Sequence, residues 1–210
     1  MIWFLYLPII LIIMIICWLT NWIVVLFADE NGEIKNKFLH LWQTWDDSLD
    51  SKFFMTQVVP KKYPFLDYNW EDKYVSIQDT KTLGQYGHTI EKVLIINHFT
   101  LKERIQRYFC RVLWLMRNPA YGWSFYIFGI TANKNELYFA KNINESNNEF
   151  VFAYDKSKNI LIRPWTLRLY KCIYKNFYIT AYLGWKLQWW SASDRLKSMI
   201  AYRIVPRLEN

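Results

Sequence analysis

The sequence predicts an α+β protein: one N-terminal transmembrane helix, then a small domain with an antiparallel β-sheet and one amphipathic helix. Three observations support this fold class. Residues 2–28 contain no charged side chain. Residues 101–117 repeat apolar side chains at the three- and four-residue spacing of a helix. From residue 120 onward, short aromatic and β-branched runs with alternating polarity are typical of strands.

The first element is the apolar run 2–28, which is long enough for a membrane anchor. About 20 apolar residues cross a bilayer core of about 30 Å. We expect residues 2–19 to span and residues 22–28 to lie at the interface. A cleaved signal peptide, the main alternative, has a basic flank and an apolar core of roughly 7–15 residues, whereas the first basic residue here is Lys35. A buried helix of a soluble domain is the third interpretation.

The remaining residues, 29–210, are enough for one compact domain. Basic residues flank and follow the anchor, and the segment before it carries none. The positive-inside rule therefore predicts a single-pass protein with its N-terminus outside and its C-terminal domain in the cytoplasm. The spacing of the three cysteines fits no disulfide framework, as expected in a reducing compartment.

Charge is distributed unevenly along the domain. Residues 29–99 carry a net charge of −3 and residues 100–210 a net charge of +11. Such a basic half indicates an anionic partner, either nucleic acid or anionic lipid, or only a solvated basic surface. The candidate residues for an anionic partner are Lys102, Arg104, Arg107, Arg111, Arg168 and Lys171.

Aromatic residues are abundant, with 12 Trp, 15 Tyr and 14 Phe. Near a bilayer, Trp and Tyr settle at the depth of the head groups. We favour a large-residue core together with such an interface over stacking platforms for bases. The candidate interface residues are Trp18, Trp22, Trp42 and Trp45.

The amphipathic helix has clear ends. Thr100 and Glu103 form a capping box at its start, and Asn118-Pro119 ends it. Its apolar stripe is expected to pack on the sheet, and the alternative is that the basic helix lies on anionic lipid. The stripe consists of Leu101, Ile105, Tyr108, Phe109, Val112, Leu113 and Met116.

Strands are predicted on both sides of this helix. Two short ones lie at 74–77 and 93–96, after a turn at Asn31-Gly32 earlier in the chain. The others are expected at 121–130, 137–140, 149–155, 160–162, 165–175, 177–187 and 202–205, with a short helix from Ser193. Arg168, Tyr170, Tyr174 and Tyr182 are expected on one face of that sheet.

No catalytic, metal or cofactor site is predicted. His40, Asp46, Asp47 and Asp50 are the densest group of possible metal ligands, and we interpret them as solvated acids or a helix N-cap. The sequence has no P-loop, dinucleotide fingerprint or nucleophile elbow, and its three histidines lack paired spacing. An enzyme is therefore not the favoured interpretation.

Several segments resemble an uncharacterised family of small tailed-bacteriophage proteins with an N-terminal hydrophobic segment. They are NWIVVLFADENGEIK (21–35), LHLWQTWDDSLD (39–50), HFTLKERIQRYFCRVLWLMRNPAYGWSFYIFG (98–129) and YLGWKL (182–187). The chain differs from the family pattern at Ile34-Lys35, where Leu-Pro is usual. The resemblance implies a viral protein in an infected bacterium, with the inner membrane as its destination, and implies no activity or cofactor.

The leading functional hypothesis is a membrane-anchored accessory phage protein that binds phage or host proteins, or the bilayer itself, at the inner membrane. One alternative is a protein that binds nucleic acid or anionic lipid at the membrane. The other is a virion component that acts in genome delivery.

Overall fold

The computed structural model describes residues 2–44, 47–52, 54–83, 86–143, 149–174, 177–187 and 195–206. By its internal contacts the chain divides into two compact units. The first unit comprises Met1–Pro8, Leu83–Tyr86 and Ser124–Asn210, and the second Ile9–Thr82 and Gly87–Trp123. The expected division into an anchor (1–28) and one domain (29–210) stays a prediction, and the structure shows that the N-terminal helix contributes residues to both units.

The N-terminal helix α1 (Ile2–Val24) continues into a 3₁₀ turn, η1 (Val25–Phe27). Residues Ile2–Phe27 are long and apolar enough to cross a membrane. One side of the helix is nevertheless buried, through Trp3, Ile10, Cys17 and Val24, which recur every two turns. Because most of its other side chains are exposed and apolar, α1 has one side covered by protein and a wide apolar side that is not.

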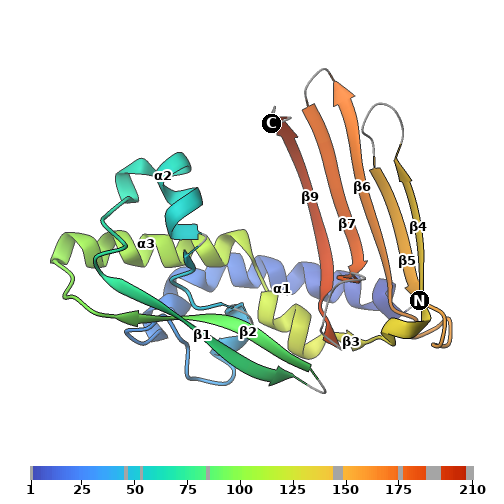
Figure 1. The fold of residues 1–210 in the computed structure, drawn as a ribbon, viewed down its shortest axis with the longest axis horizontal. Helices are drawn as coiled ribbons and strands as arrows, with labels where there is room; N and C mark the ends of the chain where they lie inside the picture. The colour runs from blue at the N-terminus through green and yellow to red at the C-terminus, as the bar shows by residue number, and fades with distance from the viewer. Residues whose placement is uncertain are drawn as a thin grey trace. The chain divides into compact units, whose positions relative to one another are not determined.

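Helix α3 (Leu101–Arg117) lies beside α1 in the second unit (Figure 1). The Tyr108 hydroxyl donates to the Trp22 carbonyl at 2.6 Å, and Trp18 Nε1 donates to the Met116 carbonyl at 3.1 Å. The predicted capping box between Thr100 and Glu103 is present, and the helix ends before Asn118 as predicted. Thr100 and Lys73 both bind the Glu103 carboxylate, whose pKa is lowered mainly by the Thr100 backbone amide.

Short helices and one hairpin complete the second unit. They are η2 (Leu39–Trp42), η3 (Phe54–Val58), α2 (Val59–Lys62), η4 (Pro64–Leu66), β1 (Tyr74–Leu83) and β2 (Tyr86–Ile95). The two strands form a sheet of their own. The core of this unit includes buried residues from α1, η3, α2 and α3, among them Cys17, Phe54, Val59 and Leu115.

The outer face of α3 is apolar, which corrects the predicted orientation of this helix. Leu101 is 75% exposed and Phe109 48% exposed, and Ile105 and Met116 are exposed on the same face. The buried face instead carries Gln106, Arg107, Cys110, Arg111, Trp114 and Leu115. The predicted stripe therefore does not pack on a sheet, and the helix turns two arginines inward.

The first unit is built on a five-stranded antiparallel sheet with the order β4-β5-β6-β7-β9 (Figure 1). Its strands are β4 (Leu137–Ile143), β5 (Glu149–Asp155), β6 (Trp165–Tyr174), β7 (Phe177–Trp185) and β9 (Ser198–Pro206). A smaller sheet pairs β3 (Ile130–Thr131) with β8 (Arg195–Leu196). A 3₁₀ turn, η6 (Lys134–Glu136), precedes β4.

Most predicted strands are confirmed, and two are wrong. Residues 160–162 form a turn, in which the Ile162 amide donates to the Asn159 carbonyl at 3.1 Å. The aromatic run after residue 120 contains a π-helix, η5 (Trp123–Ile127), instead of a strand. The helix predicted from Ser193 begins outside the described residues, and Arg195–Leu196 is a strand.

The core of the first unit joins the start of α1 to the sheet. Trp3 is buried with Ala153, Trp185, Leu187 and Leu196. Trp3 Nε1 donates to Ser198 Oγ at 3.0 Å. The indole therefore satisfies its polar atom inside an otherwise apolar core, as a buried tryptophan requires.

Candidate functional site

Asp50 is the centre of the candidate site, and a tight turn in the second unit positions it. The Leu49 amide donates to the Gly32 carbonyl at 2.9 Å, which places Asp50 against this turn. Gly32 has a φ of +77°, and a Cβ at this position would lie 2.7 Å from Asp50 Oδ2. The turn predicted at Asn31-Gly32 is thus confirmed, and glycine is needed there both for its φ and for the approach of the carboxylate.

Two arginines of α3 bind the Asp50 carboxylate. Arg111 Nε donates to Oδ1 at 2.9 Å, and its Nη2 donates to Oδ2 at 2.7 Å. Arg107 makes the corresponding bonds at 3.2 and 2.7 Å. One helical turn separates the two arginines, so both present their guanidinium groups on the same side of α3. Asp50 is completely buried, and Arg107 and Arg111 are only 8% and 7% exposed. We call these three residues the Asp50 cluster.

The Asp50 cluster is held in its ionised form. Burial would raise the pKa of Asp50, but the charges and hydrogen bonds of Arg111 and Arg107 outweigh it and lower the pKa to about 2. Burial would lower the pKa of Arg111, but the nearby Asp50 carboxylate outweighs burial and raises this pKa. One carboxylate thus balances two guanidinium groups, and the three side chains together carry a net charge of +1.

Aromatic rings and backbone carbonyls surround the two arginines. The Arg107 guanidinium lies 4.6 Å from the centre of the Phe99 ring and 5.3 Å from that of Tyr74. Arg107 Nη2 also donates to the Glu30 carbonyl, and Arg111 Nη2 donates to the Asp29 carbonyl at 3.2 Å. Within the described residues, neither Nη1 group forms a hydrogen bond.

A second network holds the turn in place. Gln43 is buried; its Oε1 accepts from the Ile34 amide at 2.9 Å, and its Nε2 donates to Glu33 Oε2 at 3.0 Å. The Asp29 carboxylate accepts from the Asn31 and Glu33 amides, both at 2.9 Å. Gln43 and Leu49 are therefore joined to residues 32–34 by hydrogen bonds that do not involve α3.

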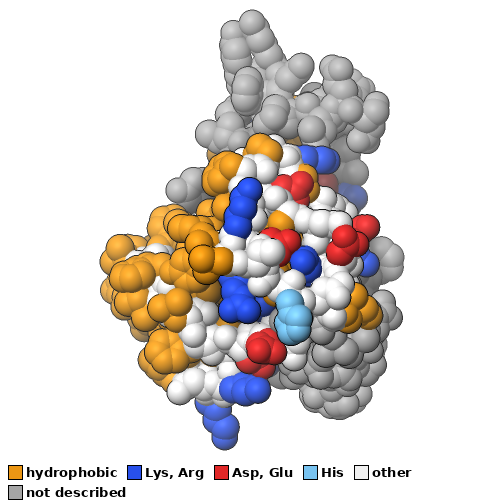
Figure 2. Space-filling model, turned by 90° about the vertical axis from the view of Figure 1, so that its left-hand side faces the viewer, with side chains coloured by type: hydrophobic (Ala, Val, Ile, Leu, Met, Phe, Trp, Pro, Cys, Tyr) orange, Lys and Arg blue, Asp and Glu red, His pale blue; other side chains and the backbone are white. Residues whose placement is uncertain are grey.

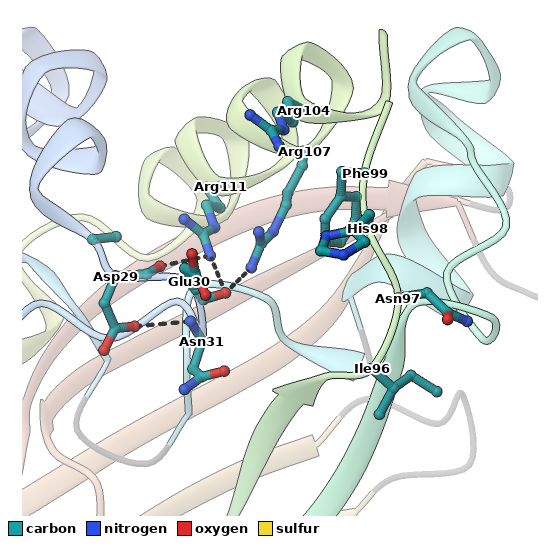
Figure 3. Close-up of a pocket in the computed structure, with 11 residues that line it drawn as sticks. Asp29, Glu30, Asn31, Ile96, Asn97, His98, Phe99, Arg104, Arg107 and Arg111 are labelled. Carbon is teal, nitrogen blue, oxygen red and sulfur yellow. Dashed lines mark hydrogen bonds between the residues drawn. The ribbon is translucent and has the colours of Figure 1, made fainter. Parts of the chain in front are cut away.

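A pocket of about 530 Å³ opens beside the Asp50 cluster (Figure 3). It is lined by Ala28, Asp29, Glu30, Asn31, Ile96, Asn97, His98, Phe99, Arg104, Arg107 and Arg111. Figure 3 shows the three arginines on successive turns of α3, with Asp29, Glu30 and Asn31 across from Arg107 and Arg111. The pocket thus has a cationic wall on α3 and an opposite wall that carries carboxylates and an amide.

The predicted anion-binding residues divide between the two units, and two of them are buried. Lys102 and Arg104 are exposed on α3, whereas Arg107 and Arg111 are buried because Asp50 draws both guanidinium groups inward. Arg168 and Lys171 are exposed on the sheet of the first unit, and Arg168 lies 3.9 Å from Glu149. Arg168, Tyr170 and Tyr182 line one shallow pocket on that sheet, as the alternation predicted; the Tyr174 side chain lies outside the described residues.

The predicted interface tryptophans differ in their exposure. Trp18 and Trp22 are exposed on α1. Trp42 is buried, and its Nε1 donates to Thr20 Oγ1 at 2.9 Å, so it is a core residue of the second unit. Trp45 lies outside the described residues.

Sequence reasoning missed the role of Asp50, which is neither solvated nor a helix cap. In the same group, His40 Nδ1 lies 3.1 Å from the Ile34 carbonyl, and Asp46 lies outside the described residues. Among the described residues, no three His, Cys, Asp or Glu side chains lie close enough to hold a metal ion. A signal was present in α3, because Arg107 and Arg111 share a helix face with Cys110, Trp114 and Leu115.

A family model for proteins of unknown function, DUF7338, matches residues 1–209. The chain belongs to this family. No curated protein and no solved structure matches the chain. Because the DUF7338 match covers both units, the Asp50 cluster and the apolar helix α1 both lie within the family region.

The geometry of this DUF7338 protein suits binding more than proton transfer. Asp50 is ionised at neutral pH and each of its oxygens accepts from both arginines, so the Asp50 carboxylate itself is not poised to take a proton. The pKa values of Tyr68 and Tyr74 are raised by burial, and their hydroxyl groups lie 3.1 Å apart. The site presents fixed positive charge beside a pocket, which is what recognition of an anionic group needs.

Proposed function

We propose that this protein is a membrane-anchored binding protein that enters the bilayer through α1 and the outer face of α3. The observation that carries the proposal is the polarity of α3. Its exposed side carries an apolar stripe of Leu101, Ile105, Phe109 and Met116, bordered by Lys102 and Arg104, and its buried face carries two arginines. A helix that faced water would show the opposite pattern, whereas lipid is a suitable neighbour for such a face.

The exposed side chains of α1 support the same conclusion. They include Ile15, Leu19, Ile23 and Leu26, together with the two exposed tryptophans. Figure 2 shows hydrophobic side chains gathered along one flank of this end of the molecule, beside a face that carries charged side chains. Soluble proteins rarely expose an apolar surface that runs along two neighbouring helices.

The resemblance to tailed-phage proteins and the distribution of basic residues supply the details of the proposal. They favour the inner membrane of an infected bacterium, with the C-terminal sheet in the cytoplasm. The positive-inside rule predicts the N-terminus outside, but Trp3 packs in the core of that sheet. The packing therefore favours a helix α1 that lies in the plane of the interface, with the N-terminus inside. The nucleic-acid alternative loses support, because Arg107 and Arg111 are engaged by Asp50 and are not on the surface.

Membrane association is tested with the full-length protein expressed in bacteria. It should sediment with the membrane fraction and resist extraction by alkaline carbonate, which releases peripheral proteins. Replacing Leu19 and Ile23 by glutamate should increase extraction, because both side chains are exposed on α1. Replacing exposed Phe65, which lies on η4, serves as the control. Wild-type protein that stays in the cytosol would refute the proposal.

Orientation is tested with reporters at the two ends of the chain. A reporter that works only in the cytoplasm should be active after Asn210, and a tag before Met1 should be protected from protease added outside the inner membrane, because Trp3 packs on the sheet. A digested N-terminal tag would replace the in-plane arrangement by the transmembrane one. An inactive C-terminal reporter would overturn the cytoplasmic location of the sheet.

A further inference from the structure

The pocket beside the Asp50 cluster keeps its charges on two walls: Arg104, Arg107 and Arg111 lie on α3, and Asp29 and Glu30 lie opposite. Two buried guanidinium groups share one carboxylate, and the carbonyls of Asp29 and Glu30 accept hydrogen bonds without supplying negative charge. A buried charge without a partner is costly. Arg104, one turn before Arg107, adds a third positive group to the lining. An anion held against the α3 wall would offset the net charge of +1 that the Asp50 cluster carries.

We propose that this pocket binds a phosphate ester that also carries a hydrogen-bond donor, such as a hydroxyl or an ammonium group. The planar fork of arginine matches the oxygens of a phosphate, and the Nη1 groups of Arg107 and Arg111 have no hydrogen-bond partner among the described residues. Across the pocket, Glu30 offers a carboxylate that accepts from a donor and would repel a bare second anion. The Asp29 carboxylate on the same wall already accepts from the Asn31 and Glu33 amides and pairs with Lys35 at 3.2 Å.

The size of the pocket supports an organic ester over a free inorganic ion. Small-molecule sites are typically about 300–1,000 Å³, and this pocket is about 530 Å³. Its lining also includes Ile96 and Phe99, which give an apolar surface to a carbon skeleton. A phosphate with an attached glycerol or ethanolamine therefore fits the mixture of charges and apolar groups.

The position of the pocket favours a phospholipid head group as the source of the phosphate ester. Exposed Phe27 ends the apolar segment, and the next residue, Ala28, lines the pocket. On α3, exposed Leu101 and Ile105 flank Arg104. A head-group phosphate lies where the apolar surface of a membrane protein meets its polar surface. The lipid source rests on the proposed membrane association, whereas binding of a soluble phosphate ester does not.

The test uses the full-length protein in a non-ionic detergent and two probes. Glycerol 3-phosphate represents the soluble ester, and its binding is measured by titration calorimetry at constant ionic strength. Phosphatidylglycerol represents the lipid source. Phosphatidylcholine, whose head group has no hydrogen-bond donor, is the control lipid and should be retained less. The lipid that the protein retains is counted by native mass spectrometry. The thermal unfolding midpoint is followed in parallel, because a ligand that binds the folded state raises it.

The decisive variant is Arg104→Gln, with Lys102→Gln as its matched control. Both residues are exposed on α3, and only Arg104 lines the pocket. Loss of one charge-assisted hydrogen bond should weaken binding about tenfold in Arg104→Gln, while Lys102→Gln should stay within about twofold of wild type. Both variants keep the Asp50 cluster intact, and equal unfolding midpoints without ligand would verify this.

The proposal is supported if glycerol 3-phosphate and lipid both bind, or if lipid alone binds, provided that only Arg104→Gln weakens the binding. Binding of lipid alone assigns the phosphate ester to a phospholipid. Binding of neither probe overturns it, and so does equal weakening in both variants, which would indicate general attraction to a basic helix. A protein that binds glycerol 3-phosphate but does not sediment with membranes would retain the pocket proposal and refute the membrane proposal.

Discussion

A single carboxylate, that of Asp50, sets the geometry of the second unit. It lies 57 and 61 residues before its two arginine partners, and it joins the turn at Gly32 to α3. Buried ion pairs contribute little net stability compared with apolar packing, but removing one partner leaves a charge stranded. The cluster therefore specifies which face of α3 points inward more than it adds to overall stability.

This carboxylate predicts a dependence of stability on pH. The pKa of Asp50 is about 2 in the fold against an ordinary value of 3.8. Because the folded pKa is the lower one, the stabilisation is complete above about pH 4 and is lost as pH falls toward 2. The difference corresponds to about 2 kcal/mol. Denaturant unfolding in detergent between pH 6 and pH 2 measures it.

Asp50→Asn should remove this acid-dependent contribution and lower the free energy of unfolding at neutral pH by about 3–5 kcal/mol, because two arginines lose their counter-charge. Asp67→Asn, at an exposed acid of the same unit, should change little. If Asp50→Asn were as stable as wild type at pH 7, the ionic account of this cluster would be refuted.

Gly32→Ala should destabilise the turn that holds Asp50. An alanine there has to adopt a φ of +77° and place its Cβ 2.7 Å from Asp50 Oδ2. The backbone conformation alone costs roughly 1–2 kcal/mol, and the displaced carboxylate should add to the loss. Asn31→Ala, in the same turn, is the control. Equal unfolding free energies for the two variants would show that the turn tolerates a side chain.

Among the elements, α3 shows which features of a helix can be predicted from sequence and which cannot. Its start at Thr100 and its end before Asn118 were predictable, because capping and proline effects are local. Which face of α3 points into the protein was not predictable, because the helix carries apolar residues on two faces. The choice between them depends on Asp50, and a contact over 57 residues leaves no local pattern.

The strands of the five-stranded sheet agree better with the sequence prediction. Alternation and turns predicted β5, β6 and β7 near their observed bounds, since a hairpin partner is close in the chain. The aromatic run at η5 was misread because aromatic residues favour strands in general. The candidate pocket was not predictable, because its walls come from residues 28–31, 96–99 and 104–111.

The outer face of α3 predicts a difference in local environment along one helix. An environment-sensitive dye on Phe109→Cys should show blue-shifted emission and be quenched by nitroxide-labelled lipids in vesicles. The same dye on Lys102→Cys is the control, and it should be quenched mainly by a water-soluble agent. Cys172→Ser is the background, since Cys17 and Cys110 are buried. Equal quenching at the two positions would contradict a lipid-facing stripe.

For the molecule as a whole, α1 is part of the folded core as well as an apolar helix with exposed side chains. Trp3 belongs to the core of the sheet, while Leu5 in the same helical turn is 72% exposed. Trp3→Ala should lower the free energy of unfolding by about 3–5 kcal/mol, with faster hydrogen exchange in β6 and β7. Leu5→Ala should leave both unchanged. Unaltered exchange in Trp3→Ala would show that the sheet does not need the helix.

The bond between Trp3 and Ser198 joins residues 195 positions apart. A ribosome adding about 5–20 residues per second takes on the order of 10–40 s to make that length of chain. For that interval the buried side of the first helical turns has no sheet to cover it. Because the strands of this sheet are made last, they complete a core whose first residue was made long before them, and the proposed anchor would serve first as a template for the sheet.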